Sequence, residues 1–534
     1  MSNQKYEKFG VMLDCSRNAV LKVSAVKQMI DCLAKMGYNV LELYTEDTYE
    51  VENEPFMGYL RGRYTSKEIK EIDAYAQAKG IELIPCIQTL AHFSAFVKNG
   101  EINGMVDTAD ILLIGEERTY RLLDNIFASL AKNFTSRNVN IGMDEAFLVG
   151  CGKYLNKHGY KDRFELILEH LTKVAEIAKK YGFKMHMWSD MFFRLANKGT
   201  YHSSEPVEIP VHVKNSVPKD VELAYWDYYS TEKNHYDAMF KSHQGFNGDI
   251  WFAGGAWTWD GFAPYHTKTL NTMRPAMESV IEHKIKNVLV TMWGDNGAEC
   301  SLFSLMPALY AVRQFADGNF DMETIKRGFN ALFGLDFDTF ALLEIPNKLN
   351  LNEKMTCGNP CKCLFYPDPF MGLMDHSVEV HDTIPYGQYR DLLKSASTKM
   401  KEYSYLFETM SALCDVLDIK AELGVKTRKA YKANDKQSLE CLVNDYQELV
   451  KRLENFHELF YNLWHKENKP QGWEIQDARL GGLMQRIKTC AKRLQAYLEG
   501  EIDALEELEE SILPLWNGSL WGNNYASLIS RSIV

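Results

Sequence analysis

The first 315 residues alternate short apolar runs with longer amphipathic stretches, and this alternation constrains the fold more than any other feature. Apolar runs of strand length separated by helical periodicity are typical of βα units that build a parallel sheet. The eight runs are Phe9 to Leu13, Asn39 to Tyr44, Ile81 to Ile87, Val139 to Met143, Lys184 to Trp188, Val221 to Trp226, Ile250 to Trp257 and Asn287 to Trp293. Eight repeats favour a closed (β/α)8 barrel over an open doubly wound sheet. No Gly-x-Gly-x-x-Gly follows any run, which argues against a dinucleotide-binding domain, and no cofactor is predicted.

Beyond the predicted barrel the pattern changes twice. Periodicity fades over residues 335–389, which contain five prolines, so a connecting or lid segment is predicted there. Apolar residues then recur three and four apart, as in packed helices. We therefore predict an α/β chain with a catalytic (β/α)8 TIM barrel over residues 1–334, an irregular segment over 335–389 and an all-α helical domain over 390–534.

Charge and hydropathy narrow the partners and the compartment. Lysine and arginine total 60 against 72 acidic residues, a net charge of −12, which argues against nucleic acid as a partner. The N-terminus is polar and no apolar run reaches ~18 residues, so neither a signal peptide nor a membrane span is predicted. An odd number of cysteines, 11, fits reduced thiols in a cytoplasmic protein better than a disulfide framework. The sequence does not fix the oligomeric state, and a homodimer is one possible assembly.

Three cysteines lie close together in the sequence, at Cys357, Cys361 and Cys363. They lack a fourth ligand at zinc-finger spacing. We therefore predict a plain loop there, and no metal site in the chain.

Functional groups of a (β/α)8 barrel project from the carboxyl ends of its strands. The first four predicted strands end in ionisable residues, within Asp14 to Arg17, Tyr44 to Asp47, Ala91 to Phe93 and Gly142 to Glu145. The later strands end in an aromatic residue near an acid, as in Trp188 with Asp190, Trp226 with Asp227, Trp257 and Trp259 with Asp260, and Trp293 with Asp295. Aromatic faces beside carboxylates suit a sugar ring, which presents apolar C–H faces and hydroxyl groups. The strand ends therefore predict a carbohydrate site.

Each of these features also has a purely structural explanation. A single tryptophan on a strand is more often a core residue, and a lone histidine such as His92 is more often structural. Asp144 and Glu145 are also compatible with a helix start, because acids favour helix N-termini. Four strand ends that each pair an aromatic residue with an acid are harder to explain by core packing alone.

Gly142-Met143-Asp144-Glu145 resembles the Asp-Glu signature of glycoside hydrolase family 20, the β-N-acetylhexosaminidases. Three further segments are similar to motifs of this family in the same order: Met12 to Arg17, Arg63 to Ile69, and Gly80 to Pro85 running on to His92. The resemblance extends to about residue 315. A barrel followed by helices is closest to the compact bacterial exo-β-N-acetylglucosaminidases of the family.

The resemblance implies an exo-acting enzyme that removes terminal β-GlcNAc, or β-GalNAc, from an oligosaccharide or glycoconjugate by substrate-assisted retaining hydrolysis. Glu145 would be the general acid, and Asp144 would hold the acetamido N–H. The implied sugar-binding residues are Arg17 and Asp295 for hydroxyl groups, Trp188, Trp257 and Trp293 for the acetamido methyl, Tyr225 with Asp227 for the acetamido carbonyl, and His92 beside the Asp-Glu pair. Tyr228 and Tyr229 are alternatives to Tyr225, and Trp259 is an alternative to Trp257. Tyr366 and Asp368 are further candidates to reach the barrel mouth of this subunit or of a partner.

Two other hypotheses stay open at this point. One is a retaining barrel glycosidase in which Asp190 or Asp227 acts as the nucleophile opposite Glu145. The other is a non-catalytic sugar-binding protein whose helical half mediates assembly.

Overall fold

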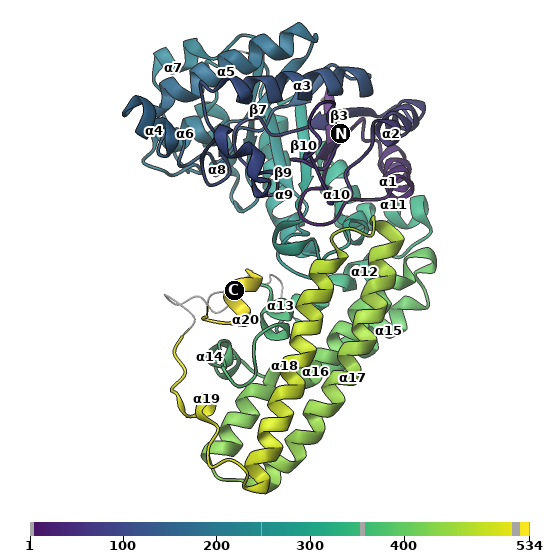
Figure 1. The fold of residues 1–534 in the computed structure, drawn as a ribbon. Coiled ribbons are helices and arrows are strands. Elements are labelled where there is room, and N and C mark those ends of the chain that lie inside the picture. The colour runs from purple at the N-terminus through teal and green to yellow at the C-terminus, as the bar shows by residue number, and fades with distance from the viewer. Residues whose placement is uncertain (1–4, 247, 353–357, 515–523, 533–534) are drawn as a thin grey trace.

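A closed barrel of eight parallel strands forms one end of the molecule, and long helices extend from it (Figure 1). The computed structural model describes residues 5–246, 248–352, 358–514 and 524–532. Around the barrel the strands follow one another as β1 Lys8–Asp14, β2 Val40–Tyr44, β3 Glu82–Cys86, β6 Asn138–Asn140, β7 Lys184–Trp188, β8 Val221–Trp226, β9 Trp251–Gly255 and β10 Asn287–Met292, and β10 pairs with β1. The predicted (β/α)8 fold is confirmed. A small antiparallel pair, β4 Val106–Thr108 and β5 Ile111–Leu112, lies in the connection between β3 and β6.

Helices surround the barrel because each connection between parallel strands must cross back over the sheet. The longer ones are α1 Val23–Met36, α2 Ser66–Ala78, α3 Glu117–Asn133, α5 Arg163–Lys180, α8 Lys233–Ser242, α9 His266–Glu282 and α10 Met306–Ala316. Three short ones, α4 Lys153–His158, α6 Asp190–Ala196 and α7 Val211–Ser216, lie in the loops. Thr65 and Glu68 form a capping box at the start of α2, where each side chain accepts a hydrogen bond from the other residue's backbone N–H.

The barrel interior holds a buried polar cluster as well as apolar side chains. Glu42 accepts hydrogen bonds from His186, at 2.8 Å, and from Asn140, at 3.4 Å. The His186 ring stacks on Trp251 with a centroid separation of 4.1 Å. Because the Asn140 side chain also accepts from the Gly142 N–H at 3.0 Å, this cluster reaches the end of β6.

The helical part begins after the barrel and contains the longest helices of the chain (Figure 1). Its helices are α11 Met322–Phe333, α12 Phe337–Ala341, α13 Pro360–Phe365, α14 Asp375–Glu379, α15 Tyr386–Ser397, α16 Ser404–Lys432, α17 Lys436–Glu467, α18 Trp473–Glu499, α19 Glu506–Glu509 and α20 Tyr525–Ile529. The helices α16, α17 and α18 pack side by side. Residues 335–389, predicted to be irregular, contain α12, α13 and α14. Pro360 does not disrupt α13 because it stands at its first residue, where the missing N–H has no helical partner.

A buried carboxylate fastens the helical part to the barrel. Glu467, at the end of α17, accepts hydrogen bonds from the Ser301 hydroxyl after β10 and from the Tyr405 hydroxyl of α16, both at 2.7 Å. Burial raises the pKa of Glu467 to about 7. The backbone N–H of Lys22 also donates to the Glu467 carbonyl, at 2.8 Å. The end of α17 is therefore bonded to the barrel on two sides.

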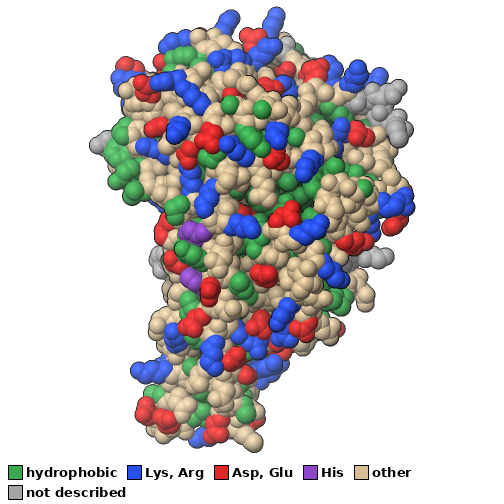
Figure 2. Space-filling model, turned by 90° about the vertical axis from the view of Figure 1, so that its right-hand side faces the viewer, with side chains coloured by type: hydrophobic (Ala, Val, Ile, Leu, Met, Phe, Trp, Pro, Cys, Tyr) green, Lys and Arg blue, Asp and Glu red, His purple; other side chains and the backbone are tan. Residues whose placement is uncertain are grey.

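Acidic and basic side chains are interspersed over the face of the molecule seen in Figure 2. Within the described parts of the chain, no helix has a stretch that is both long and apolar enough to cross a bilayer.

Candidate functional site

A cavity opens at the carboxyl ends of the barrel strands, where such barrels carry their functional groups. Its volume is about 530 Å³, including the part open to solvent. The lining residues are Arg17, Tyr44, His92, Asp144, Glu145, Trp188, Trp226, Tyr228, Tyr229, Trp259, Trp293 and Asp295. Seven of the ten predicted site residues are among them. Their predicted roles stay predictions.

The backbone after β6 turns so that two neighbouring carboxyl groups face one cavity. In a strand Asp144 and Glu145 would point to opposite faces, but β6 ends at Asn140. Gly142, Met143 and Glu145 then have φ angles of 68°, 70° and 53°, in the left-handed region that non-glycine residues rarely adopt. This change of backbone conformation brings both side chains to the cavity.

Gln88 supports this turn from the end of β3. Its side-chain oxygen accepts from the Met143 N–H at 3.2 Å, and its side-chain N–H donates to Asp144 at 2.8 Å. The same amide nitrogen also donates to the Tyr44 hydroxyl at 3.1 Å. A Cβ atom at position 142 would lie 2.1 Å from the Gln88 oxygen, so only glycine fits beneath this amide.

Asp144 is held as an anion. His92 Nε2 lies 3.2 Å from its carboxylate, and burial leaves the residue only 8% exposed. Burial by itself raises the pKa of Asp144, but the charge of His92 and the hydrogen bonds from His92 and Gln88 lower it below its ordinary value. Burial lowers the pKa of His92, whereas the charges of Asp144 and Glu46 outweigh this and raise it to about 10. The two residues therefore form an ion pair at neutral pH.

The pKa of Glu145 is shifted in the opposite direction to that of Asp144. Burial, followed by the negative charge of Asp144, raises the pKa of Glu145 above its ordinary value. Its side chain remains 41% exposed, and its backbone N–H donates to the Asp190 carboxylate at 3.1 Å. Asp190, at the start of α6, is fully buried, and burial together with the charge of Asp144 raises its pKa to about 7. One of the two adjacent carboxyl groups thus favours the anion and the other favours the acid.

Arg17, in the loop after β1, lies between acidic side chains of two other strand ends. Its guanidinium is 3.0 Å from Glu46 and 3.8 Å from Asp295. Burial raises the pKa of Glu46 to about 7 and that of Asp295 to about 6. Asp14, the last residue of β1, joins the loop after β1 to the loop after β10, because its carboxylate accepts from the Ser16 hydroxyl at 2.7 Å and the Gly294 N–H at 2.9 Å.

Aromatic rings from four later strands form the opposite wall. Trp188 and Trp293 lie with ring centroids 6.3 Å apart, and Trp226 stacks on Tyr228 at 5.3 Å. Tyr228 in turn meets Trp259 edge to face at 5.5 Å. The buried Nε1 of Trp188 has no hydrogen-bond acceptor among the described residues. The wall therefore combines apolar ring faces with a polar donor.

Tyr225 and Asp227, predicted at the site, do not line this cavity. Alternation along β8 turns Trp226 toward the cavity and Tyr225 toward the outer helices, where its ring packs against Phe240 at 5.6 Å. Asp227 accepts from the Tyr225 hydroxyl at 2.8 Å and from the Tyr229 N–H at 2.9 Å, so its carboxylate stabilises the turn after β8. Placing Tyr225 and Asp227 at the cavity was wrong.

Trp257 is also displaced from the cavity. Its ring stacks on Trp259 at 4.1 Å and its Nε1 donates to the Tyr228 carbonyl at 3.1 Å. The prediction assumed a strand that continues to Trp257, whereas β9 ends at Gly255. Beyond the strand the period of two no longer applies, and Trp259 takes the cavity position.

Sequence reasoning missed several residues of the site. Gln88 and Asp190 contact the Asp-Glu pair, Tyr44 and Trp226 line the cavity, and Glu46 pairs with Arg17. All five stand at or just after a predicted strand end. This position in the sequence was the one indication that they belong to the site, but it does not show in which direction a side chain points.

Tyr366 and Asp368 do not reach the barrel mouth of their own chain. The Tyr366 hydroxyl donates to Glu299 at 2.7 Å, and Asp368 is paired with Arg486 of α18. Both side chains join parts of the helical region to each other or to the loop after β10.

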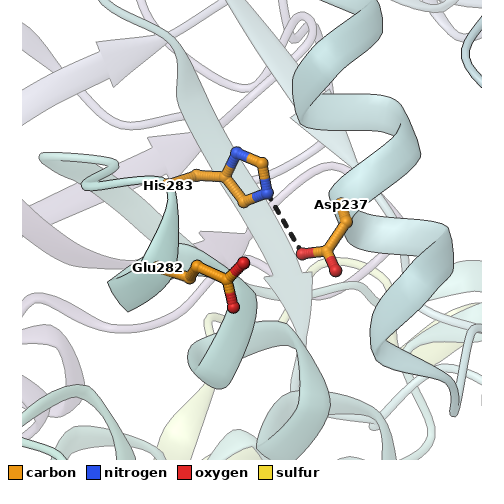
Figure 3. Close-up of side chains that lie close together, drawn as sticks. All are labelled: Asp237, Glu282 and His283. Carbon is orange, nitrogen blue, oxygen red and sulfur yellow. Dashed lines mark hydrogen bonds and ion pairs between the residues drawn. The ribbon is translucent and has the colours of Figure 1, made fainter.

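Among the described residues, one group of side chains has the spacing of a metal site, Asp237, Glu282 and His283 (Figure 3). Asp237 lies in the middle of α8, and Glu282 and His283 lie at the end of α9. The Lys233 ammonium is 2.7 Å from Asp237 and 2.8 Å from Glu282. Because this cation already pairs with both carboxylates, we assign no metal to the group.

Two of the three clustered cysteines, Cys361 and Cys363, lie within the described residues. Cys361 donates to the Asn347 side-chain oxygen and Cys363 to that of Asn359, both at 3.0 Å. Cys357 lies outside the described residues.

Two family models match parts of this chain. Residues 6–244 match the family model described as "Glycosyl hydrolase family 20, catalytic domain", and residues 338–522 match "Glycoside Hydrolase 20C C-terminal domain". The chain is 23% identical to beta-hexosaminidase 3 of Arabidopsis thaliana, over 35% of this chain and 38% of that protein. It is 28% identical to a beta-hexosaminidase of Vibrio furnissii, over 34% of this chain and 36% of that protein. The chain thus covers well under half the length of either relative.

One solved structure is the beta-N-acetylhexosaminidase of Bacteroides fragilis NCTC 9343. It is 20% identical to this chain, with a TM-score of 0.48 over 63% of this chain and 71% of that one.

Replacing Gly142 tests the turn that presents the two carboxyl groups. Gly142→Ala adds a Cβ atom 2.1 Å from Gln88 to the strain of a positive φ angle, so we expect a loss of more than ~3 kcal/mol in the free energy of unfolding. Gly80→Ala is the matched control, since its φ is 75° and a Cβ atom there meets nothing within 4 Å. We expect about 1 kcal/mol for it. Equal losses in urea unfolding would contradict the proposed fit beneath Gln88.

Proposed function

The chain belongs to glycoside hydrolase family 20, and we propose that it is an exo-acting β-N-acetylhexosaminidase that removes terminal non-reducing β-GlcNAc. The observation that carries the proposal is the pair of adjacent carboxyl groups, Asp144 and Glu145, which face one cavity with pKa values shifted in opposite directions. The aromatic wall beside them suits the apolar face of a sugar. β-GalNAc is included as a second substrate, because Asp295 by itself does not decide the configuration at C4.

The proposed reaction is substrate-assisted. The carbonyl oxygen of the 2-acetamido group attacks C1, so the enzyme supplies no nucleophile. Glu145 donates its proton to the glycosidic oxygen as that bond breaks, and burial together with the charge of Asp144 raises its pKa, which favours the protonated form. It then takes a proton from the water that opens the cyclic intermediate, which restores the acid.

Asp144 acts on the acetamido group. As an anion it accepts the acetamido N–H and offsets the positive charge that develops on the oxazolinium-like ring. His92 and Gln88 hold its carboxylate before that charge appears, at 3.2 Å and 2.8 Å, so little reorganisation is needed during the reaction. The acid and the anion thus have separate tasks although they are neighbours in the chain.

The remaining cavity residues are assigned to sugar binding. Tyr228 is proposed to donate to the acetamido carbonyl, because its ring lies in the cavity wall between Trp226 and Trp259. The indole rings of Trp188, Trp293 and Trp259 enclose the acetamido methyl. Arg17 and Asp295 bind hydroxyl groups on the far side of the ring.

The proposal also includes a location in the reducing cytoplasm and assembly as a homodimer. None of the ten cysteines in the described residues forms a disulfide, which supports a cytoplasmic location. The homodimer stays a prediction.

Removing the proposed acid tests the assignment. We expect Glu145→Gln to lower turnover of an aryl β-GlcNAc by at least ~100-fold, and more for a sugar leaving group, which needs protonation more. The fold should be unaffected because this side chain is 41% exposed. Exposed Glu205→Gln is the control.

Wild-type enzyme should release the aryl group from β-GlcNAc and not from β-Glc, which lacks the acetamido group. Binding of GlcNAc without release would favour a non-catalytic sugar-binding protein.

A second experiment separates the neighbouring-group route from an enzyme nucleophile. We expect a thiazoline analogue of the cyclised sugar to inhibit tightly, since it resembles the intermediate. A 2-fluoro glycoside should leave no covalent adduct on the protein in a mass spectrum. Asp190 and Asp227 are the rival nucleophiles, and both carboxylates already accept backbone N–H bonds, at 3.1 Å and 2.9 Å. An adduct on either would overturn the substrate-assisted mechanism.

The charge of His92 gives a pH prediction. The kcat/KM profile should rise as Asp144 loses its proton and fall at higher pH as Glu145 loses its own. Protonated His92 lowers the pKa of both carboxyl groups, so removing this cation raises both pKa values. We expect His92→Asn to move both limbs of the profile to higher pH, and asparagine tolerates the φ of 61° at this position.

His202→Asn provides the control for this profile. Burial lowers the pKa of His202 and so disfavours its charged form, although its ring contacts Trp226. Its replacement should leave both limbs in place. A profile that His92→Asn does not move would contradict the ion pair with Asp144.

A further inference from the structure

The loop after β10 carries two cavity residues on a strained backbone. Trp293 and Asp295 line the cavity, and the three residues Asn296, Gly297 and Ala298 that follow have φ angles of 57°, 124° and 53°. Left-handed conformations cost roughly 1–2 kcal/mol each at non-glycine positions. This conformation persists only if its surroundings stabilise it.

The barrel holds the start of this loop. The Thr258 hydroxyl donates to the Trp293 carbonyl at 2.7 Å, and Asp14 accepts the Gly294 N–H at 2.9 Å. Both bonds precede the strained residues. They fix where the loop leaves the barrel, and the direction it then takes depends on later contacts.

The helical region holds the strained residues themselves. Arg479 of α18 donates to the Asn296 carbonyl at 2.7 Å, and Lys362 of α13 donates to the same oxygen at 3.2 Å. Gln476 of α18 donates to the Gly297 carbonyl at 2.9 Å. A Cβ atom at Gly297 would lie 2.3 Å from the Arg479 guanidinium, so the guanidinium packs directly on this glycine.

A buried ionic network completes the attachment. Glu299, at the end of the loop, lies 2.8 Å from Arg479 and 2.9 Å from Lys362, and it accepts from the Tyr366 hydroxyl at 2.7 Å. The side chains of Glu299 and Lys362 are 1% and 0% exposed. Removing one partner of such a network leaves an uncompensated buried charge. The network therefore fixes one geometry for the loop.

We propose that Arg479 and Lys362 are positioning residues of the sugar site, which hold Trp293 and Asp295 against the donor sugar through the Asn296 carbonyl and Glu299. The helical domain is then part of sugar recognition. This inference rests on the proposed function. Because Asp295 and Arg17 are together assigned to hydroxyl groups of the ring, the position of this loop contributes to the discrimination between GlcNAc and GalNAc, which differ at C4.

The first test compares two arginines of α18. Arg479→Gln should lower kcat/KM for aryl β-GlcNAc by about 100-fold, as expected for misplaced binding groups, and change the GlcNAc to GalNAc ratio. Arg479→Lys keeps the charge beside Glu299 and should recover part of the loss. Arg486→Gln is the matched control, because Arg486 pairs with Asp368 away from the loop, and its effect should be no more than about twofold. Equal effects of Arg479→Gln and Arg486→Gln would overturn the proposal.

A double-mutant cycle separates positioning from general stability. If Arg479 acts through Asp295, Arg479→Gln should cost much less in an Asp295→Ala background than in the wild type. Losses that multiply independently would indicate a structural role only and would overturn the proposal.

Hydrogen exchange gives a readout that does not depend on activity. Amides of residues 293–299 should exchange faster in Arg479→Lys than in the wild type, and at the wild-type rate in Arg486→Gln. The conservative variant Arg479→Lys allows this measurement even if Arg479→Gln fails to fold. Unchanged exchange in Arg479→Lys would overturn the positioning role. Wild-type protein that hydrolyses neither aryl N-acetylhexosaminide would refute the proposed function, while the exchange data would still decide whether Arg479 holds the loop.

Discussion

The left-handed backbone between Gly142 and Glu145 is the constraint on which the site depends. A regular strand would turn one of the two carboxyl groups into the barrel wall. The strand instead stops at Asn140, and Gln88 bonds both the backbone N–H of Met143 and the carboxylate of Asp144. One amide side chain thus fixes the turn and one of its functional groups together, so the geometry of the pair is set before any ligand arrives.

The two carboxyl groups acquire different chemistry from their different neighbours. Asp144 is buried against His92 and Gln88, which favour its charged form. Glu145 lies beside the Asp144 anion, and burial together with this negative charge raises the pKa of Glu145. Asp190 lies behind the pair and is held by Arg194, at 3.2 Å, and by the Glu145 N–H. A carboxyl group can therefore favour the acid or the anion according to the balance of burial, hydrogen bonds and nearby charges around it, a difference that charge counting along the sequence cannot reveal.

Periodicity predicted the barrel well because eight buried strands leave eight apolar runs, and it predicted the cavity only in part. It failed where a strand ends earlier than its apolar run. The sequence predicts Trp257 at the cavity, with Trp259 as its alternative, but β9 stops at Gly255 and the two rings stack on each other. Tyr225 was chosen from a motif although alternation along β8 turns it outward. Gln88 and Asp190 were missed because their roles depend on hydrogen bonds to backbone from another strand end, and a single sequence carries no signal for such pairs.

The helical domain meets the barrel at the loop after β10, which carries the cavity residues Trp293 and Asp295. Two buried carboxylates make the connection: Glu467 of α17 accepts from Ser301, and Glu299 of the loop is paired with Arg479 and Lys362. Ser301 and Glu299 both belong to the segment that follows Trp293 and Asp295. An apolar interface tolerates small sliding, whereas a buried charge must keep its partners or bear the cost of desolvation. Docking through buried charges therefore fixes the orientation of this segment more strictly than apolar packing would. A barrel of this kind gains a rigid wall for its cavity from residues that lie more than 60 positions further along the chain.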